Sequence, residues 1–183
     1  YAFFGLPPGE HVHMDLRCDY FCELAVKAGY KCHVFQIRRK RGKLPDWEQE
    51  QKQLGHWLRG LPKPIGIMTC NDDRGQQLLD ACRRADMAVP EQVAVVGVDN
   101  DQELCNLATR PLSSVDVNSR RIGYGAAAQL DRMMAMGMTR PPNEVVFAPS
   151  HVVTRLSTDT MAVDDPALAR ALQFIRDHAC KGI

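Results

Sequence analysis

An excess of charge of either sign is missing from this chain. Lysine and arginine together number 23, aspartate and glutamate 22, and the formal net charge is +1. Nucleic-acid-binding domains are usually much more basic, so most of the chain is not expected to be one. Long apolar runs are missing too. None approaches the roughly 20 residues that a membrane-spanning helix needs, so we expect no contact with a membrane.

Catalytic and metal-binding signatures are also absent. The sequence contains no Gly-rich phosphate loop, no Gly-x-Ser-x-Gly elbow, and no Ser, His and Asp in a plausible order. His11-x-His13 and the Cys18/Cys22 pair fall short of the ligand spacing of a zinc site. We therefore expect neither enzymatic activity nor a metal or cofactor. An α/β sugar-modifying enzyme stays open as an alternative, because carboxylates at strand ends could do acid–base chemistry.

Cysteine is present in an odd number, which argues against a disulfide framework. The cysteines are scattered and lie mostly inside apolar runs: Cys18, Cys22, Cys32, Cys70, Cys82, Cys105 and Cys180. This pattern predicts reduced core thiols in a cytoplasmic protein. The chain opens on the apolar run Tyr1–Gly5 without an initiator methionine, so we expect it to be part of a longer protein.

Two apolar runs share one layout. Ile65–Asp72 and Val93–Asn100 each pass through apolar residues and end on Asn and Asp side chains. Such runs are typical of strands buried on both faces of a parallel sheet. Ligands of open α/β sheets bind beyond the carboxyl ends of the strands. Amides and carboxylates at that edge suit a neutral, hydroxyl-rich ligand, since they can donate and accept several hydrogen bonds.

Strand and helix patterns alternate along the first part of the chain. The expected strands are Ala2–Phe4, His33–Ile37, Ile65–Cys70 and Val93–Val98, and the expected helices are Val12–Ala28, Asp46–Arg59 and Asp72–Asp86. This alternation predicts an α/β fold with a doubly wound parallel sheet. The later part breaks the pattern, with a short turn at Leu104–Thr109, an extended Leu112–Asp116, a helix at Ile122–Met136, a β-rich run at Glu144–Leu156 broken by Pro149, and a helix at Leu168–Cys180.

Four segments resemble a known family by their order. Ile67–Asp72, Val95–Asp99, Pro111–Val115 and Arg155–Thr158 follow one another as in the effector domain of LacI/GalR-family repressors, which is similar to periplasmic sugar-binding proteins. The resemblance covers about residues 1–158. The tail, Asp165–Ile183, resembles instead the first helix of an AraC-type DNA-binding domain.

Together the two resemblances imply a sugar-sensing module of a cytoplasmic transcription regulator. They imply a small-molecule sugar, D-xylose, as ligand, DNA as a partner through a domain mostly beyond residue 183, and a homodimer in the full-length protein. A sugar bound between two subdomains would favour a closed state, and this closure would reposition the DNA-binding unit. A free-standing solute-binding protein for transport is a further alternative.

The resemblance also implies a division of the chain. Residues 1–116 would form the C-terminal subdomain of the effector domain, and 117–148 would return to an N-terminal subdomain that precedes Tyr1. Residues 149–158 would add the last strand of the C-terminal subdomain. Residues 159–183 would be a linker and the first helix of the DNA-binding domain. The chain would then cross the hinge near Val115–Val117 and near Pro149.

The same resemblance implies the ligand-binding residues. Asp99 would bind sugar hydroxyls from the end of a strand, although it could simply cap the next segment. One of Asn71 and Asp72 would face the ligand while the other caps a helix. Arg17, on the first helix, would point into the cleft, unless it pairs with nearby aspartates on the surface.

Two further residues are candidates with plain structural alternatives. Trp47 matches a position where sugar binders stack an aromatic ring on the sugar, but it could be a core residue at a helix start. Asn118 follows the second crossing and could also reach the cleft. Trp57 is expected in the core. The basic run Arg38–Lys43 is better interpreted as a solvated loop than as a nucleic-acid patch.

Overall fold

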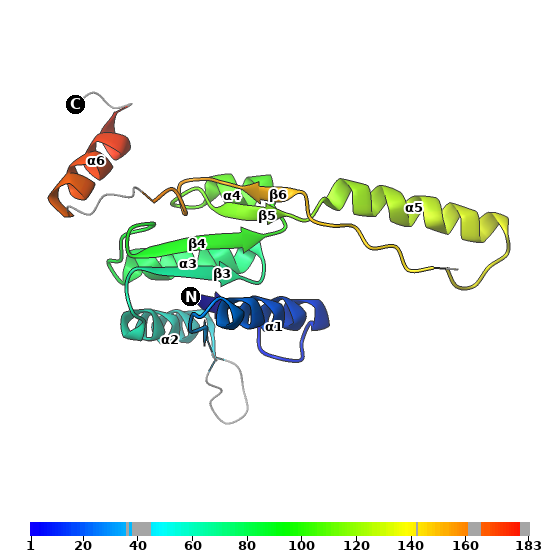
Figure 1. The fold of residues 1–183 in the computed structure, drawn as a ribbon, viewed down its shortest axis with the longest axis horizontal. Helices are drawn as coiled ribbons and strands as arrows, with labels where there is room; N and C mark the ends of the chain where they lie inside the picture. The colour runs from blue at the N-terminus through cyan, green and yellow to red at the C-terminus, as the bar shows by residue number, and fades with distance from the viewer. Residues whose placement is uncertain (36, 38–44, 142, 161–165, 180–183) are drawn as a thin grey trace.

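The computed structural model describes residues 1–35, 37, 45–141, 143–160 and 166–179. Strands and helices alternate through most of this part of the chain (Figure 1). In chain order they are β1 (Ala2–Phe4), α1 (Val12–Lys27), β2 (His33–Val34), α2 (Trp47–Gly60), β3 (Ile65–Thr69), α3 (Asp72–Arg84), β4 (Val93–Val98), α4 (Gln102–Leu107), β5 (Ser113–Asp116), α5 (Ser119–Ala135), β6 (His151–Val153) and α6 (Pro166–His178).

The strands form one sheet in the order β2-β1-β3-β4-β5-β6. Every neighbouring pair from β2 to β5 is parallel. The prediction of a doubly wound parallel sheet is therefore confirmed for these strands. The exception is β6, which runs antiparallel to β5 and pairs Val152 with Val115.

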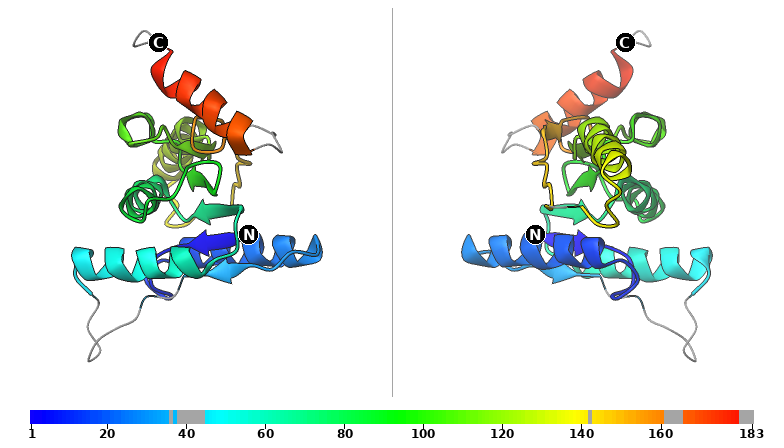
Figure 2. Two further views of the ribbon diagram at one scale, coloured as in Figure 1. Left: turned by 90° about the vertical axis from the view of Figure 1, so that its left-hand side faces the viewer. Right: turned by 90° about the vertical axis from the view of Figure 1, so that its right-hand side faces the viewer.

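Helices cover both faces of the sheet, because successive side chains of a strand point to opposite sides. On β1, the ring of Phe3 lies 5.9 Å from the ring of Phe21 in α1. The next residue, Phe4, belongs instead to the hydrophobic cluster that contains Leu54 and Leu58 of α2. Figure 2 shows α1 on one side of the strands and α2 and α3 on the other.

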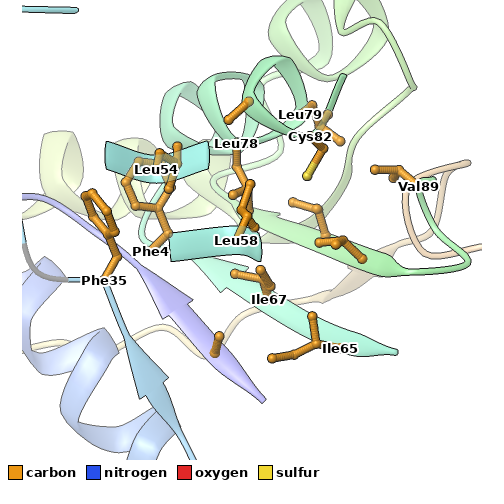
Figure 3. Packing of buried hydrophobic residues seen from close by; sticks show 14 of the residues in the cluster. Phe4, Phe35, Leu54, Leu58, Ile65, Ile67, Leu78, Leu79, Cys82 and Val89 are labelled. Atoms are coloured by element: carbon orange, nitrogen blue, oxygen red, sulfur yellow. The ribbon is translucent and has the colours of Figure 1, made fainter. Parts of the chain in front are cut away.

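The hydrophobic core lies between the sheet and the helices α2 and α3 (Figure 3). Its buried members alternate along β3 and β4, which places Ile65 and Ile67 beside Val93 and Val95. Trp57 packs against this cluster, with its ring 5.3 Å from that of Phe35, so the core prediction for Trp57 is confirmed.

Helix α2 begins where the sequence predicts, because Asp46 accepts a hydrogen bond from the backbone N–H of Gln49 at 2.8 Å. Helix α1 ends at the predicted glycine, since Gly29 has a φ of +84°. No helix in the described ranges combines the length and apolarity needed to cross a membrane.

An arm projects from the sheet. After β5 the chain enters α5, which extends away from the strands, and an extended segment runs back beside it to β6 (Figure 1). No residue of α5 is buried. Within the run Glu144–Leu156, a strand forms only at His151–Val153, where β5 offers partners for hydrogen bonding.

Ser157, after β6, fastens the returning chain to the core. This fully buried residue donates its hydroxyl to the carbonyl oxygen of Val95 at 2.6 Å and accepts the N–H of Ser113 at 2.8 Å. Its own carbonyl oxygen accepts the N–H of Val95, and its N–H donates to Pro111. The segment after β6 is thus part of the sheet's hydrogen-bond network.

Some sequence predictions need correction. Cys22 and Cys32 form a disulfide, so the prediction that all cysteines are reduced thiols is wrong for this pair. Their Cα atoms are 5.3 Å apart, because the turn after α1 brings the helix beside β2. The predicted strand at His33–Ile37 is shorter, ending at Val34. Arg38–Lys43 and Cys180 lie outside the described residues.

Candidate functional site

The carboxyl ends of β3 and β4 carry the predicted polar residues, and α1 adds an arginine above them. Arg17 donates from Nη1 to the carbonyl oxygen of Cys70 at 2.6 Å and from Nη2 to Oδ1 of Asp99 at 3.1 Å. The two side chains are 25% and 42% exposed, so both remain open to a ligand. The structure therefore brings together two residues that are 82 positions apart in the sequence.

Asp99 lies in a strained turn. Asp99 and Asn100 have φ angles of +106° and +52°, a backbone region that costs free energy for residues other than glycine. Three hydrogen bonds hold this geometry. Asp99 N–H donates to Val115 at 3.0 Å, Asn100 N–H to Ser114 Oγ at 3.0 Å, and Asp101 N–H to Asp72 Oδ2 at 2.8 Å. The turn is thus fixed before any ligand arrives.

Asp72 holds this turn by accepting the hydrogen bond from the backbone N–H of Asp101. It is 2% exposed, and its second oxygen, Oδ1, accepts the hydroxyl of Ser114 at 2.6 Å. Burial raises the pKa of Asp72, while the bonds from Ser114 and Asp101 oppose that rise. Both carboxylate oxygens have protein partners, so Asp72 serves here as a support. The side chain is buried, and its role as a ligand residue stays a prediction.

Asn71 caps helix α3. Its Oδ1 accepts the N–H of Arg74 at 3.0 Å, which is the capping role that the sequence left open. The amide nitrogen Nδ2 of Asn71 has no hydrogen-bond partner in the part of the chain that the structure describes. Capping therefore uses the acceptor of this side chain and leaves its donor available.

Trp47 and Asn118 are not brought into contact with the Arg17–Asp99 pair. Trp47 is 47% exposed, and its ring centre lies 4.6 Å from the guanidinium carbon of Arg84, in the last turn of α3. Asn118 has left-handed backbone angles and precedes α5 without capping it. Because β5 is parallel to β4, Asn118 leaves the sheet at the same edge as Asp99.

Sequence reasoning missed the arginine that braces this edge from the other side. Arg155 donates to Asn100 Oδ1 and to the carbonyl oxygen of Leu112, both at 2.9 Å. It belongs to the segment Arg155–Thr158, which the resemblance had marked, but its role depends on β6 returning beside β5. Among the described residues, no group of three or more His, Cys, Asp and Glu could hold a metal ion.

The arrangement offers a fixed set of donors and acceptors. Oδ2 of Asp99 has no hydrogen-bond partner among the described residues, so it can accept a hydroxyl. The guanidinium of Arg17 is planar and can donate to neighbouring oxygens. The buried thiol nearest the pair is that of Cys70, and burial raises its pKa, which disfavours the reactive thiolate. Such a set of donors and acceptors is suited to hydrogen bonding with a hydroxyl-rich molecule.

Comparison with known proteins gives consistent results. The periplasmic binding protein-like domain model matches residues 1–158. Over its whole length the chain is 35% identical to the xylose operon regulatory protein of Haemophilus influenzae and 34% identical to that of Escherichia coli K12, covering 47% and 46% of those proteins. The chain thus spans about half the length of these curated relatives.

Solved structures show the same likeness. The structure of the xylose-binding transcription activator XylR matches all of this chain, at 34% identity and a TM-score of 0.82, over 47% of its own length. A LacI family regulator from Enterococcus faecalis, solved with bound ribose, matches 87% of this chain at 18% identity and a TM-score of 0.68. At that identity the second likeness supports the fold alone.

Proposed function

Because the chain belongs to the periplasmic binding protein-like domain family, we propose that it is part of the sugar-sensing effector domain of a transcription regulator. The proposed ligand is D-xylose. The two relatives compared above, each about twice as long as this chain, are xylose operon regulatory proteins. This favours a binding module over the alternatives, an α/β sugar-modifying enzyme or a free-standing solute-binding protein.

The observation that carries the proposal is the contact between Arg17 and Asp99 at the carboxyl edge of the sheet. A neutral sugar needs acceptors for its hydroxyl hydrogens and donors for its oxygens. Asp99 supplies an acceptor with a negative charge, which makes such bonds stronger than neutral ones. Asn71 adds an amide donor, and Asn118 leaves the same edge at the crossing into α5. Trp47 stays a proposed ligand residue that would stack on the sugar, although its ring contacts Arg84.

The projecting arm supports the proposed division of the chain. Residues 1–116 would form one subdomain, and 117–148, which contain α5, would complete a second subdomain. None of the residues of α5 is buried, as expected for a helix whose packing partners lie elsewhere. Residues 149–158 return to the sheet, and 159–183 would lead into an AraC-type DNA-binding domain.

Signal transmission in this proposal is a population shift. A sugar bound between the two subdomains favours a closed state, to the extent that it binds that state more tightly. Closure then repositions the DNA-binding unit. The full-length protein would act as a homodimer, since AraC-type domains usually read repeated half-sites. It would work in the cytoplasm, where its DNA is. That location does not rest on the cysteine pattern, because Cys22 and Cys32 are paired.

The test is calorimetric titration of the full-length protein with D-xylose, with glucose and ribose as controls. We expect selective binding of D-xylose that is lost in Asp99→Ala. The matched control is Asp73→Ala, which removes an exposed carboxylate from the first turn of α3. Binding that survives Asp99→Ala would refute the assigned site. Binding of none of the three sugars would refute the proposed ligand and favour a screen for enzymatic activity.

A further inference from the structure

The disulfide Cys22–Cys32 lies on the same helix as the sugar-site arginine. Cys22 is in α1, five residues after Arg17, which corresponds to about 7.5 Å along a helix axis. Cys32 immediately precedes the edge strand β2. Both cysteines are half-buried, so a small thiol or disulfide in solution can reach them. The bridge therefore ties the helix that presents Arg17 to the edge of the sheet.

Apart from the bonds of Arg17 to Cys70 and Asp99, helix α1 has few other anchors. Ala25 is its only buried residue. Its aromatic contacts with β1 and the residue before it come from one ring, Phe21, which lies 5.9 Å from Phe3 and 6.4 Å from Tyr1. Several of its apolar side chains face outward, including Leu16, Tyr20 and Leu24. The covalent link to Cys32, just before β2, is thus a large share of what fixes the second half of this helix.

The remaining described cysteines are poor competitors for oxidation. Cys70, Cys82 and Cys105 are buried, and burial raises the pKa of all three thiols, to about 12 for Cys82 and Cys105. Burial, Asp19 and Asp15 raise the pKa of Cys18. Since the thiolate is the reactive species, these groups stay protonated and react slowly.

We propose that Cys22 and Cys32 form a reversible redox couple that sets how firmly α1 holds Arg17 over Asp99, and so couples sugar affinity to the thiol–disulfide balance. This inference rests on the proposed sugar-sensing function. In the oxidising direction, the thiolate of one cysteine attacks a small disulfide such as oxidised glutathione and releases one thiol. The second cysteine then displaces the other thiol, which leaves the Cys22–Cys32 bond and two reduced glutathione molecules.

The experiment compares the full-length protein after equilibration with reduced and with oxidised glutathione. Two quantities are measured: the Kd for D-xylose by calorimetry, and amide hydrogen exchange of residues 12–28 without sugar. We expect the oxidised form to bind about fivefold more tightly, the low end of typical coupling between sites, and to exchange more slowly in α1. Both differences should vanish in Cys22→Ser and persist in Cys18→Ser, which removes a thiol one turn earlier in α1.

Three results separate the inference from the function on which it rests. Cysteines 22 and 32 that stay reduced in excess oxidised glutathione would overturn the redox couple. A disulfide that forms without changing either the Kd or the exchange of α1 would overturn the coupling and leave the sugar-sensing function intact. Absence of D-xylose binding in both redox states would overturn the function, and hydrogen exchange would then decide alone whether the pair restrains α1.

Discussion

Replacement of Gly97 by alanine probes the support beneath the Asp99 turn. Gly97 lies in β4, two residues before Asp99, and is buried. A Cβ atom at this position would overlap Oδ1 of Asp72 and lie 3.1 Å from Cδ2 of Leu112. The carboxylate of Asp72 cannot withdraw easily, because Ser114 and Asp101 both donate hydrogen bonds to it.

The expected cost of Gly97→Ala has two parts. Forcing a methyl group into a well-packed interior costs about 2 kcal/mol. Breaking one of the hydrogen bonds to the buried Asp72 carboxylate costs about 2 kcal/mol more. We therefore expect the free energy of unfolding to fall by about 4 kcal/mol, a large share of the 5–15 kcal/mol typical of a domain. Sugar affinity should fall as well, because the displaced carboxylate no longer fixes the turn at Asp99.

Urea denaturation of the two proteins measures the difference. Gly55→Ala is the matched control. Gly55 is buried in α2, and the nearest atom to its added Cβ, Nη1 of Arg59, is 3.9 Å away. Alanine favours a helix over glycine, so this variant should gain up to about 1 kcal/mol. A Gly97→Ala variant within 1 kcal/mol of wild type, a margin comparable to the scatter of ordinary substitutions, would refute the argument about the Asp72 support.

Three further predictions use other parts of the structure. Burial raises the pKa of Asp72 in the folded protein above its ordinary 3.8. Protonated Asp72 therefore adds most to stability below pH 3.8, and this contribution is lost as the pH rises through the raised pKa. Urea titrations should show Asp72→Asn gaining on wild type with rising pH, and a constant difference would contradict this. Trp47→Ala should lower the unfolding free energy only slightly, because the lost Arg84 contact is exposed to solvent. A fall in sugar affinity in that variant would instead support stacking on the ligand. Glu50→Gln should cost about 2 kcal/mol in thermal unfolding, because it removes the 2.6 Å ion pair of the buried Arg74, and an unchanged melting temperature would show that the pair contributes nothing.

The parallel part of the fold could be predicted because its signals are local. Val93–Val98 is a strand with the bounds that its apolar run predicts. Asp46 marks the start of α2 by capping it, and Gly29 marks the end of α1 by its left-handed backbone conformation. Such elements depend on residues within a few positions, so one sequence is enough to find them.

The features that were missed depend on distant partners. The extent of β6 is set by β5, since a strand forms only where Val152 meets Val115. Pairing of Cys22 with Cys32 depends on where the turn after α1 places β2. The sequence likewise marks Asp72 as a polar residue at a strand end, whereas its burial follows from a contact with Ser114, 42 positions later.

The hydrogen bonds of Ser157 bear on where this chain can be shortened. A version ending at residue 153 would retain every strand that the structure describes, yet it would leave the N–H of Ser113 and the carbonyl oxygen of Val95 without their partner Ser157. Each unsatisfied buried group costs about 1–3 kcal/mol. The minimal folding unit is therefore defined by a residue outside any strand or helix, and truncations judged by secondary structure alone would stop too early.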